Sequence, residues 1–419
     1  MTRATRAEDP KARAPLRAGP ALAPAVFREL RRTMELACFK WDVQVGDTTA
    51  LAPFPLFLDE ATWAHLGGLA ERLTRETLAA EREILDRPAL QRRIWLPPAL
   101  QRLFRRAAAA RPTPSAARVM RFDFHFTTEG WRISEVNSDV PGGFTEATHF
   151  TALVAGCFPG TRAAGDPTKR LVDALLGRAR DEGAIALLSA PGFMEDHQVV
   201  THLAKQLRDR GAAAFCASPA HVRFHDGRAH LISAEYHGPL GALVRFYQAE
   251  WLPRLPRAVD WEPLFVGGRT PVSNPGTAAL SESKRLPLVW DELGARLDTW
   301  RRLLPETRDP RDAPWLRDDG WILKSAYCNT GDTVSMRPHM TALEWANLAL
   351  RVSLAPSGWV AQRKFVTVPL ETPLGPMLPC IGVYTVDGRA AGAYGRVTEK
   401  PFIDAGATDV AVLIAEERP

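Results

Sequence analysis

RFDFHFTTEGWRISEVNSDVPGG, residues 121–143, is the stretch of sequence that decides the fold of this chain. Polar and apolar residues alternate along RFDFHF and again along WRISEVN, with a Thr-Glu-Gly turn between them, and this pattern predicts a β-hairpin. Strand side chains repeat every second residue, so Arg121 and Asp123 share one face of the first arm. Glu135 and Asn137 share a face of the returning arm, and we therefore expect one arginine and three oxygen-bearing side chains to meet on one surface of a sheet.

Two carboxylates and an amide oxygen beside a guanidinium suit Mg²⁺ that carries a nucleotide phosphate, because this hard cation prefers oxygen ligands. For a hairpin taken at random, a solvated outer face with ordinary salt bridges is the more frequent explanation of the same residue types. The spacing along the chain favours the magnesium explanation.

Arg-x-Asp, followed twelve residues after the aspartate by Glu-x-Asn, resembles the magnesium-binding hairpin of ATP-grasp ligases, and above all the synthetase part of glutathionylspermidine synthase. The resemblance implies that Asp123, Glu135 and Asn137 hold Mg²⁺ and that Arg121 contacts the phosphoryl group in transfer. In most ATP-grasp proteins this hairpin lies near the C-terminus, whereas here it lies in the first third of the chain. That order is typical of the circularly permuted ATP-grasp group.

Two later segments resemble the nucleotide-binding lysines of the same family. SESKRLPLVWDEL (281–293) aligns Lys284 with a lysine that contacts ATP, and GWILKSAYCNTGDTVSM (320–336) places Lys324 on a strand before a glycine loop around Gly331. That loop lacks the Gly-Lys-Ser/Thr ending of a P-loop, but small residues let backbone N–H groups approach phosphates. Taken alone, a lysine on a strand such as Lys324 is usually solvated, and Lys284 could simply be exposed.

The last two segments complete the resemblance. WVAQRKFVTVP (359–369) resembles the hinge strand beside adenine and aligns Gln362 with it, while YTVDGRAAGAYGRVTEKPFI (384–403) aligns Arg396 with an arginine near the γ-phosphate. An ordinary edge-strand amide and a structural arginine are the alternative explanations of these two residues. Four segments in the permuted order favour the family over the separate alternatives.

The resemblance implies the fold class and the division of the chain. We expect an α/β (α+β) protein with a circularly permuted ATP-grasp fold, a Rossmann-like pre-ATP-grasp subdomain and a helical N-terminal region. The expected parts are a disordered basic leader (1–20), a mainly helical region (21–118), an ATP-grasp segment with the magnesium hairpin (119–164), the α/β subdomain (165–265) and the nucleotide-binding segment (266–419).

Two of these parts have local signals of their own. In the helical region, Asp59 is the expected N-cap of a helix whose apolar stripe includes Leu66, Leu69 and Leu73. In the α/β subdomain, AIALLSA is a buried strand, a helix ending at Gly211 follows it, and AAFCAS makes the next strand.

Polar residues in the α/β subdomain lie where open α/β sheets bind ligands. Glu195, Asp196 and His197 follow the end of the first strand. A helix-capping acidic pair is the alternative explanation of the two carboxylates. Arg245 is a further residue that could face the cleft.

Charge does not indicate a nucleic-acid partner. The formal net charge is +5, but residues 1–33 hold eight Lys/Arg and three Asp/Glu, and the remaining chain carries 45 of each kind. The leader is rich in Ala, Pro and Arg, a composition typical of disorder. A basic arm that binds polyanions is the alternative, although the leader lacks interleaved aromatic residues and no basic stripe continues beyond it.

Composition favours a cytoplasmic protein without a membrane partner. No run approaches the ~20 apolar residues of a membrane helix, and the apolar run in the leader is too short for a signal peptide. Five cysteines (38, 157, 216, 328 and 380) are scattered without CxxC spacing. Such scatter indicates reduced thiols rather than disulfides or a zinc site.

The resemblance implies an ATP-dependent carboxylate–amine ligase with Mg²⁺ as cofactor and ATP as co-substrate. A small-molecule or peptide carboxylate would attack the γ-phosphoryl group, and an amine would then displace phosphate from the acyl phosphate to form an amide. Residues 138–143 depart from the family's run that helps bind glutathione, and the stretch before residue 119 is too short for the amidase half, so both substrates stay open. The alternative is a degenerate ATP-grasp module that binds nucleotide but does not catalyse the formation of an amide bond.

Overall fold

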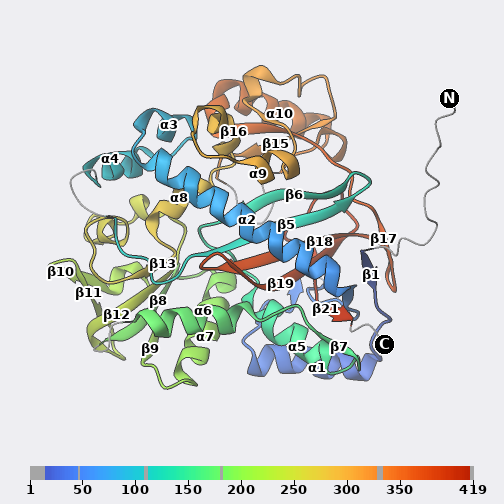
Figure 1. Ribbon diagram of the computed structural model, residues 1–419, viewed down its shortest axis with the longest axis horizontal. Helices are drawn as coiled ribbons and strands as arrows, with labels where there is room; N and C mark the ends of the chain where they lie inside the picture. The colour runs from blue at the N-terminus through green and yellow to red at the C-terminus, as the bar shows by residue number, and fades with distance from the viewer. Residues whose placement is uncertain (1–14, 46–47, 108–111, 180–182, 328–333, 416–419) are drawn as a thin grey trace, which may run out of the picture.

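The computed structural model describes residues 15–45, 48–107, 112–179, 183–327 and 334–415. Within these ranges the chain forms several β-sheets flanked by helices (Figure 1), which is the mixed α/β class that the sequence predicts. No helix in the same ranges is long and apolar enough to cross a membrane.

The central sheet joins early and late parts of the chain. Its strands follow the order β20-β19-β18-β5-β6, β17 pairs with β18 beside this path, and all neighbours are antiparallel. The strands are β5 Val119–Thr127, β6 Gly130–Asn137, β17 Leu370–Thr372, β18 Gly375–Val386, β19 Arg389–Thr398 and β20 Thr408–Val410. Because β5 lies directly beside β18, the hairpin from the first third of the chain and the last hairpin form one surface.

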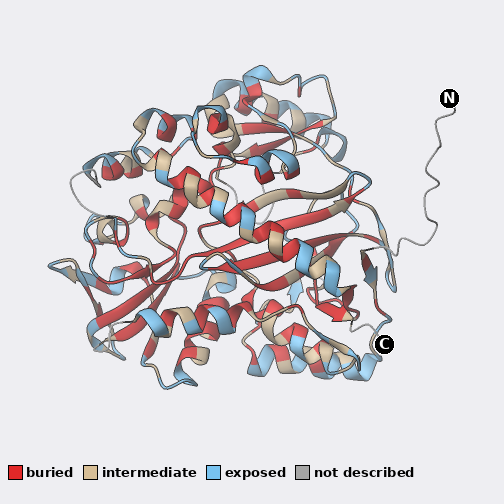
Figure 2. Cartoon of the chain, viewed as in Figure 1, coloured by how far each residue is buried: buried red, intermediate tan, exposed pale blue. Residues whose placement is uncertain are grey.

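Helix α2 (Glu60–Leu85) crosses one face of this sheet and contacts β18 and β19 (Figure 1). The Asp59 side chain accepts a hydrogen bond of 2.6 Å from the Thr62 N–H, so the expected N-cap is confirmed. Leu66, Leu69 and Leu73 are buried as the apolar stripe predicts. Figure 2 shows buried residues along the strands of the central sheet and exposed ones on the outer side of the helix.

Short helices pack around α2 and each other: α3 Pro88–Arg93, α4 Pro98–Ala107, α8 Ala279–Glu282 and α9 Asp298–Leu303. A three-stranded sheet follows them in the order β14-β16-β15, with bounds β14 Thr307–Arg308, β15 Trp321–Ser325 and β16 Trp359–Arg363. Helix α10 (Ala342–Leu354) packs Leu348 and Val352 against Trp321 and Leu323 of this sheet. The layer carries the strands on which the sequence places Lys324 and Gln362.

Residues 165–265 contain the expected strand–helix–strand unit, which belongs to a sheet that also includes β13 at residues 272–273. Its strands follow the order β10-β11-β12-β8-β9, with β13 beside β12, and β8 pairs in parallel with both β9 and β12. The strands are β8 Ala184–Ser189, β9 Ala214–Ala217, β10 Val222–His225, β11 Arg228–Ile232, β12 His237–Phe246 and β13 Val272–Ser273. Helices α6 (Pro167–Arg178) and α7 (Met194–Arg208) pack together beside the sheet.

Segments from both ends of the chain build a smaller sheet. Its order is β1-β4-β21-β7, with β1 Leu16–Ala18, β4 Leu56–Leu58, β7 Thr161–Ala163 and β21 Val412–Ala415, while β2 Gln44–Val45 pairs only with β3 Thr48–Thr49 among the described strands. Helices α1 (Pro24–Ala37) and α5 (Thr151–Ala155) lie beside it (Figure 1). β1 falls inside the stretch expected to be disordered up to residue 20, so that boundary is wrong for residues 16–18. Leu16 is buried there against the core, which explains why the segment is ordered.

Candidate active site

The β5–β6 hairpin brings its four polar residues to one face, as the alternation predicts. Asp123 lies opposite Glu135 and Arg121 lies opposite Asn137 in the antiparallel register. Residues directly opposite each other in a pair of strands point to the same side. A register shift follows Asp123, where Phe124 pairs with Ile133.

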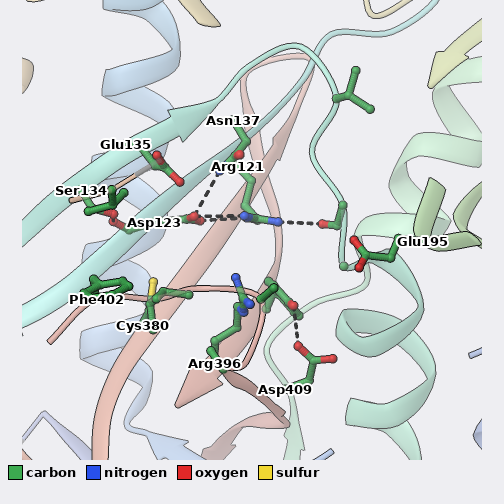
Figure 3. Close-up of a pocket in the computed structure, with 18 of the residues that line it drawn as sticks. Arg121, Asp123, Ser134, Glu135, Asn137, Glu195, Cys380, Arg396, Phe402 and Asp409 are labelled. Carbon is green, nitrogen blue, oxygen red and sulfur yellow. Dashed lines mark hydrogen bonds and ion pairs between the residues drawn. The ribbon is translucent and has the colours of Figure 1, made fainter. Parts of the chain in front are cut away.

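Arg121 is held by a set of contacts on this face (Figure 3). Its Nε and Nη2 donate to the two carboxylate oxygens of Asp123 at 2.8 and 3.0 Å, and its Nη1 donates to the Gly142 carbonyl at 2.9 Å. The ring of Tyr394 lies 5.1 Å from the guanidinium carbon. Burial opposes the charge of Arg121, but the Asp123 carboxylate outweighs it and raises the pKa of the guanidinium well above its usual value. Arg121 therefore stays charged and oriented in a buried position.

Lysines surround Glu135. Lys284 Nζ lies 3.3 Å from Glu135 Oε2 and 3.4 Å from Glu282 Oε1, and Lys324 Nζ donates to the Ser134 carbonyl at 3.0 Å. Burial opposes ionisation of Glu135, but the charges of Lys284, Lys324 and Arg121 outweigh it and lower its pKa to about 2. The carboxylate is therefore ionised at neutral pH, although it is mostly buried.

A cavity of about 490 Å³ opens over this face. Most of the residues that the sequence selects line it: Arg121, Asp123, Glu135, Asn137, Lys324, Gln362 and Arg396. Lys284 is not among the lining residues, since it lies against the two carboxylates with a nearly buried side chain. Gly331 lies outside the described residues. Segments 121–137, 324, 362 and 396, which are far apart in sequence, thus meet at one cavity.

Gln362 lies on the central strand of its three-stranded sheet, between β14 and β15, and is buried. Its Nε2 donates to Thr307 Oγ1 at 3.0 Å. The amide is therefore fixed in orientation at the wall of the cavity, and the edge-strand explanation of this residue does not apply.

Arg396 lies on β19 opposite Cys380 of β18, below Arg121 in Figure 3. Its Nη2 donates to the Asp404 carbonyl at 2.5 Å, while its buried Nε has no hydrogen-bond partner. No ion pair joins it to a carboxylate among the residues that the structure describes. Burial opposes its charge, yet the neighbouring Tyr394 and Asp409 raise its pKa above the usual value. A buried cation with an unused donor beside a cavity is suited to an anionic ligand.

The predicted metal ligands require one adjustment. Within the described ranges, no three His, Cys, Asp or Glu side chains are grouped to hold a metal ion, and the predicted set has two carboxylates and one amide. Asn137 presents its Nδ2 to Asp123 Oδ2 at 3.1 Å, whereas a metal ligand must present its oxygen. A half-turn of the amide would turn the oxygen to that side, because nitrogen and oxygen are interchangeable in shape. The donor set then fits Mg²⁺, which takes carboxylate and amide oxygens.

One cluster beside the cavity was not found from the sequence. Lys40 is buried, and its Nζ lies 2.9 Å from Asp42, 2.5 Å from Glu146 and 3.1 Å from Asp409. The Tyr394 hydroxyl donates to Asp409 at 2.5 Å, and its ring faces Arg121. These residues come from four distant segments without a shared motif, so no spacing in the sequence could have grouped them.

The loops after β8 and β12, together with the first turn of α7, form another part of the wall. They contribute Phe193, Glu195, Asp196, Gln248, Glu250 and Trp251 to the cavity. The sequence selects Glu195 and Asp196, but it overlooks residues 248–251. The sequence holds one indirect signal for them, the mostly apolar run at residues 240–246, which is typical of a second buried strand with a ligand-binding loop after it.

Two residues of this subdomain lie elsewhere than expected. Arg245 is fully buried, forms a bidentate ion pair with Asp139, and does not line the cavity. His197 is also absent from the lining, and its ring lies 5.7 Å from that of Trp41. Arg245 instead joins the subdomain to the segment that follows the hairpin.

A family model and one solved structure agree with this architecture. The sequence matches the family model described as glutathionylspermidine synthase pre-ATP-grasp over residues 28–415. Among solved structures, a glutathione synthetase-like effector from Globodera pallida in its apo form has a TM-score of 0.62 and 13% identity, over 93% of this chain and 97% of that chain. A putative gamma-glutamylcysteine synthetase from Methylobacillus flagellatus KT has a TM-score of 0.43 and 12% identity, over 78% of this chain and 88% of that chain. No curated protein matches the sequence.

The likeness to the effector concerns the fold, because the sequence identity is low. The family match spans nearly the whole chain and includes the hairpin, both lysine segments and the last hairpin. This protein therefore belongs to the glutathionylspermidine synthase pre-ATP-grasp family and has a circularly permuted ATP-grasp fold.

Proposed function

We propose that this protein is an ATP-dependent carboxylate–amine ligase that forms an amide through an acyl phosphate and releases ADP and phosphate. The observation that carries the proposal is the meeting of Arg121, Asp123, Glu135 and Arg396 at one cavity, on strands from opposite parts of the chain. Two basic and two acidic side chains on one surface suit a metal–polyphosphate complex, whose own charges are mixed.

The nucleotide would lie between the two sheets that carry these residues. Lys324 would contact its phosphates and Gln362 would border the base, while Lys284 would act through Glu135, which it touches. Asp123, Glu135 and Asn137 would hold Mg²⁺, which would neutralise charge on the phosphate oxygens. Arg121 and the unpaired donor of Arg396 would stabilise charge that develops on the phosphoryl group during transfer.

The two substrates would then react in sequence. An oxygen of the acid carboxylate attacks the γ-phosphorus, the bond to the β-phosphate oxygen breaks, and ADP leaves. The amine nitrogen next attacks the carbonyl carbon of the acyl phosphate, the C–O bond to phosphate breaks, and an amide remains. Since little covalent chemistry falls to the protein, its side chains act by positioning and by charge stabilisation.

We place the amine at the wall built by the loops after β8 and β12. Asp196 Oδ2 and Gln248 Oε1 are buried acceptors without hydrogen-bond partners, and the rings of Phe193 and Trp251 lie 5.2 Å apart beside them. Unpaired buried acceptors favour a ligand that brings N–H donors. An amine is such a ligand, and the aromatic rings suit its cationic form.

The cellular setting is part of the same proposal. Cys38, Cys157, Cys216 and Cys380 are free thiols in the described part of the chain. Free thiols are typical of a reducing compartment, which supports a cytoplasmic enzyme.

The test is a screen for ADP and phosphate release. Acids would include α-amino acids, dicarboxylic acids and γ-glutamyl peptides such as glutathione, and amines would include methylamine, diamines and spermidine. A productive acid with Mg·ATP and hydroxylamine should give a hydroxamate, because hydroxylamine intercepts an acyl phosphate. Release of AMP and pyrophosphate would refute the proposal, and tight ATP binding without turnover of any pair would favour the degenerate nucleotide-binding module.

A further inference from the structure

Glu250 lies at the ligand-binding end of two parallel strands. β12 ends at Phe246, which pairs with Ser189 at the end of β8, so the loops that follow the two strands lie side by side. Ligands of open α/β sheets bind beyond the carboxyl ends of such strands. Glu250 is in the loop after β12 and lines the cavity there.

Two neighbouring carboxyl groups, those of Asp139 and Glu282, act on the charge of Glu250, and both already have hydrogen-bond partners. Asp139 accepts from Arg245 at 3.1 Å and from the Ala249 N–H at 2.8 Å. Glu282 accepts from the backbone N–H groups of Ser138 and Asp139 at 2.8 and 2.9 Å and lies 3.4 Å from Lys284. Both carboxyl groups are therefore held in place by these contacts.

Glu250 has no comparable partners. Among the described residues, its carboxyl makes no ion pair, and the hydrogen bond that affects it comes from its own backbone N–H. The charge of Arg245 acts on it, but Arg245 is bound to Asp139, and the Tyr327 hydroxyl donates to the Ala279 carbonyl at 3.0 Å. The carboxyl of Glu250 is thus available to a group that enters the cavity.

The surroundings of Glu250 raise the pKa of its carboxyl group towards the neutral range. Burial raises the pKa of this carboxyl to about 8, and the negative charges of Asp139 and Glu282 add to the effect while Arg245 partly offsets it. A group with a pKa near the working pH can both take up and give back a proton.

We propose that Glu250 accepts the proton that the attacking amine must lose, which makes it a catalytic residue of the ligase reaction. The inference rests on the proposed function. An amine that enters as an ammonium ion has no lone pair for attack. One N–H bond breaks, its proton passes to a Glu250 carboxylate oxygen, and the freed electron pair forms the C–N bond as the C–O bond to phosphate breaks. The second nitrogen proton leaves with the departing phosphate.

Asp196 is the competing candidate on the same wall. Burial raises its pKa to about 6, and a hydrogen bond with Gln248 partly offsets the effect. Asp196 lies in the first turn of α7, and its buried Oδ2 has no hydrogen-bond partner, so its role would be to bind the ammonium ion rather than to take its proton. The two roles predict different kinetic effects when each carboxylate is replaced by its amide.

The experiment compares two nucleophiles with one acid and Mg·ATP. The first is the amine that the screen selects, which enters as an ammonium ion; the second is hydroxylamine, which is already neutral at pH 7. Glu250→Gln should lower kcat for amide formation by about 100-fold or more, and hydroxamate formation should stay within about 3-fold of wild type because its nucleophile needs no first deprotonation. Asp196→Asn should chiefly raise the KM for the amine.

The pH profile supplies a second measurement. In wild type, kcat/KM for the amine should rise as the pH passes about 8, where Glu250 becomes the carboxylate. In Glu250→Gln the rise should shift to the pKa of the free amine. Glu262→Gln, a surface change outside the cavity lining, is the matched control and should behave as wild type.

The outcomes separate the inference from the proposed function. Equal loss of amide and hydroxamate in Glu250→Gln, or an unchanged rate for both, would overturn the role of Glu250 while leaving a working ligase. Absence of hydroxamate from wild type with every acid would instead contradict the proposed function. If Glu250→Gln fails to fold, Glu250→Ala should regain amide formation with added formate, and absence of that rescue in a folded variant would overturn the assignment.

Discussion

Asp123 and Glu135 face each other across two strands, yet the structure holds them differently. Asp123 is bound by Arg121 and Asn137, whereas Glu135 lies among lysines. Asp123→Asn or Glu135→Gln keeps the shape of the side chain and removes its charge. We therefore expect the transition state of amide formation to lose several kcal/mol of stabilisation while the fold persists. The measurement is turnover against Mg²⁺ concentration.

Glu129→Gln is the control for this prediction, because Glu129 lies in the turn of the same hairpin and pairs on the surface with Arg132. Near-normal turnover of Asp123→Asn or Glu135→Gln at limiting Mg²⁺ would contradict the metal assignment.

The arginines and Lys324 should differ in kinetics. Arg121 and Arg396 would act on charge that develops during transfer, so replacement by Ala should depress kcat with little change in the KM for ATP. Lys324→Ala should weaken ATP binding as well. Arg121→Lys should not restore turnover, since one ammonium cannot span the two Asp123 oxygens that the guanidinium holds. Normal kcat in Arg121→Lys, or unchanged ATP affinity in Lys324→Ala, would refute the role of that residue.

The stability of the fold in acid should depend on the ion pairing of Glu135 with the lysines around it. Its pKa in the folded protein, about 2, lies below the ordinary value, so its ion pairs stabilise the fold above that ordinary value. That stability is lost as the pH falls from about 5 towards 2. Urea unfolding of wild type and Glu135→Gln should therefore differ most at neutral pH and converge in acid. A difference that grows in acid would contradict the expected sign.

At the scale of elements, the packing of β18 against the Arg121 and Asp123 side chains requires a glycine at position 382. A Cβ added at Gly382 would lie 2.8 Å from Arg121 Cδ and 2.9 Å from Asp123 Oδ1, since these side chains cross the glycine. Gly382→Ala should therefore displace the Arg121–Asp123 pair and lower kcat at least about 10-fold with a smaller effect on thermal stability.

Gly177→Ala is the matched control for that change. Gly177 lies in α6, and nothing within 4 Å would meet its Cβ. This replacement should keep activity and raise stability by roughly 0.5–1 kcal/mol, because Ala is the better helix former. Full activity in Gly382→Ala would show that the site tolerates the shift.

Elements with a clear period could be predicted from the sequence. The hairpin, α2 with its Asp59 cap, and the strand–helix–strand unit at β8 to β9 all follow from local alternation or helical spacing. Two- and three-residue strands such as β1 could not, because long-range pairing rather than local pattern stabilises them. The same reason hides the Lys40 cluster, whose members meet only in the folded chain.

Candidate site residues could likewise be predicted where a local pattern marks them, and not where only the folded chain brings them together. Residues within a family motif, such as Asp123, Glu135 and Arg396, were selected from the sequence and line the cavity. Arg245 was misjudged because alternation gives a face but not which face is covered, and here Asp139 covers it. Glu250 was overlooked because a loop residue after a strand has no periodic signal.

At the scale of the molecule, both ends of the chain contribute to one small sheet. β21 is its third strand, between β4 and β7, so deletion of residues 412–419 should expose two strand edges and unfold the protein. Deletion of residues 1–14 removes no described strand and should leave ATP turnover unchanged. Circular dichroism and activity measure the two results.

The second deletion also tests the polyanion-binding alternative. A protein that binds polyanions through its basic leader should lose most of its affinity and its salt dependence once residues 1–14 are gone. A ligase should keep the same turnover, with the same salt dependence, after this deletion.

The direct pairing of β5 with β18 has a consequence for synthesis on the ribosome. More than half of the chain lies between Thr127 and Gly375, so β5 emerges long before its neighbour. At roughly 5–20 residues per second, the delay is on the order of ten to fifty seconds. During that time the nascent chain displays an unpaired strand edge carrying Phe122, Phe124 and Phe126, which is a feature that chaperones bind and that promotes aggregation when they are scarce.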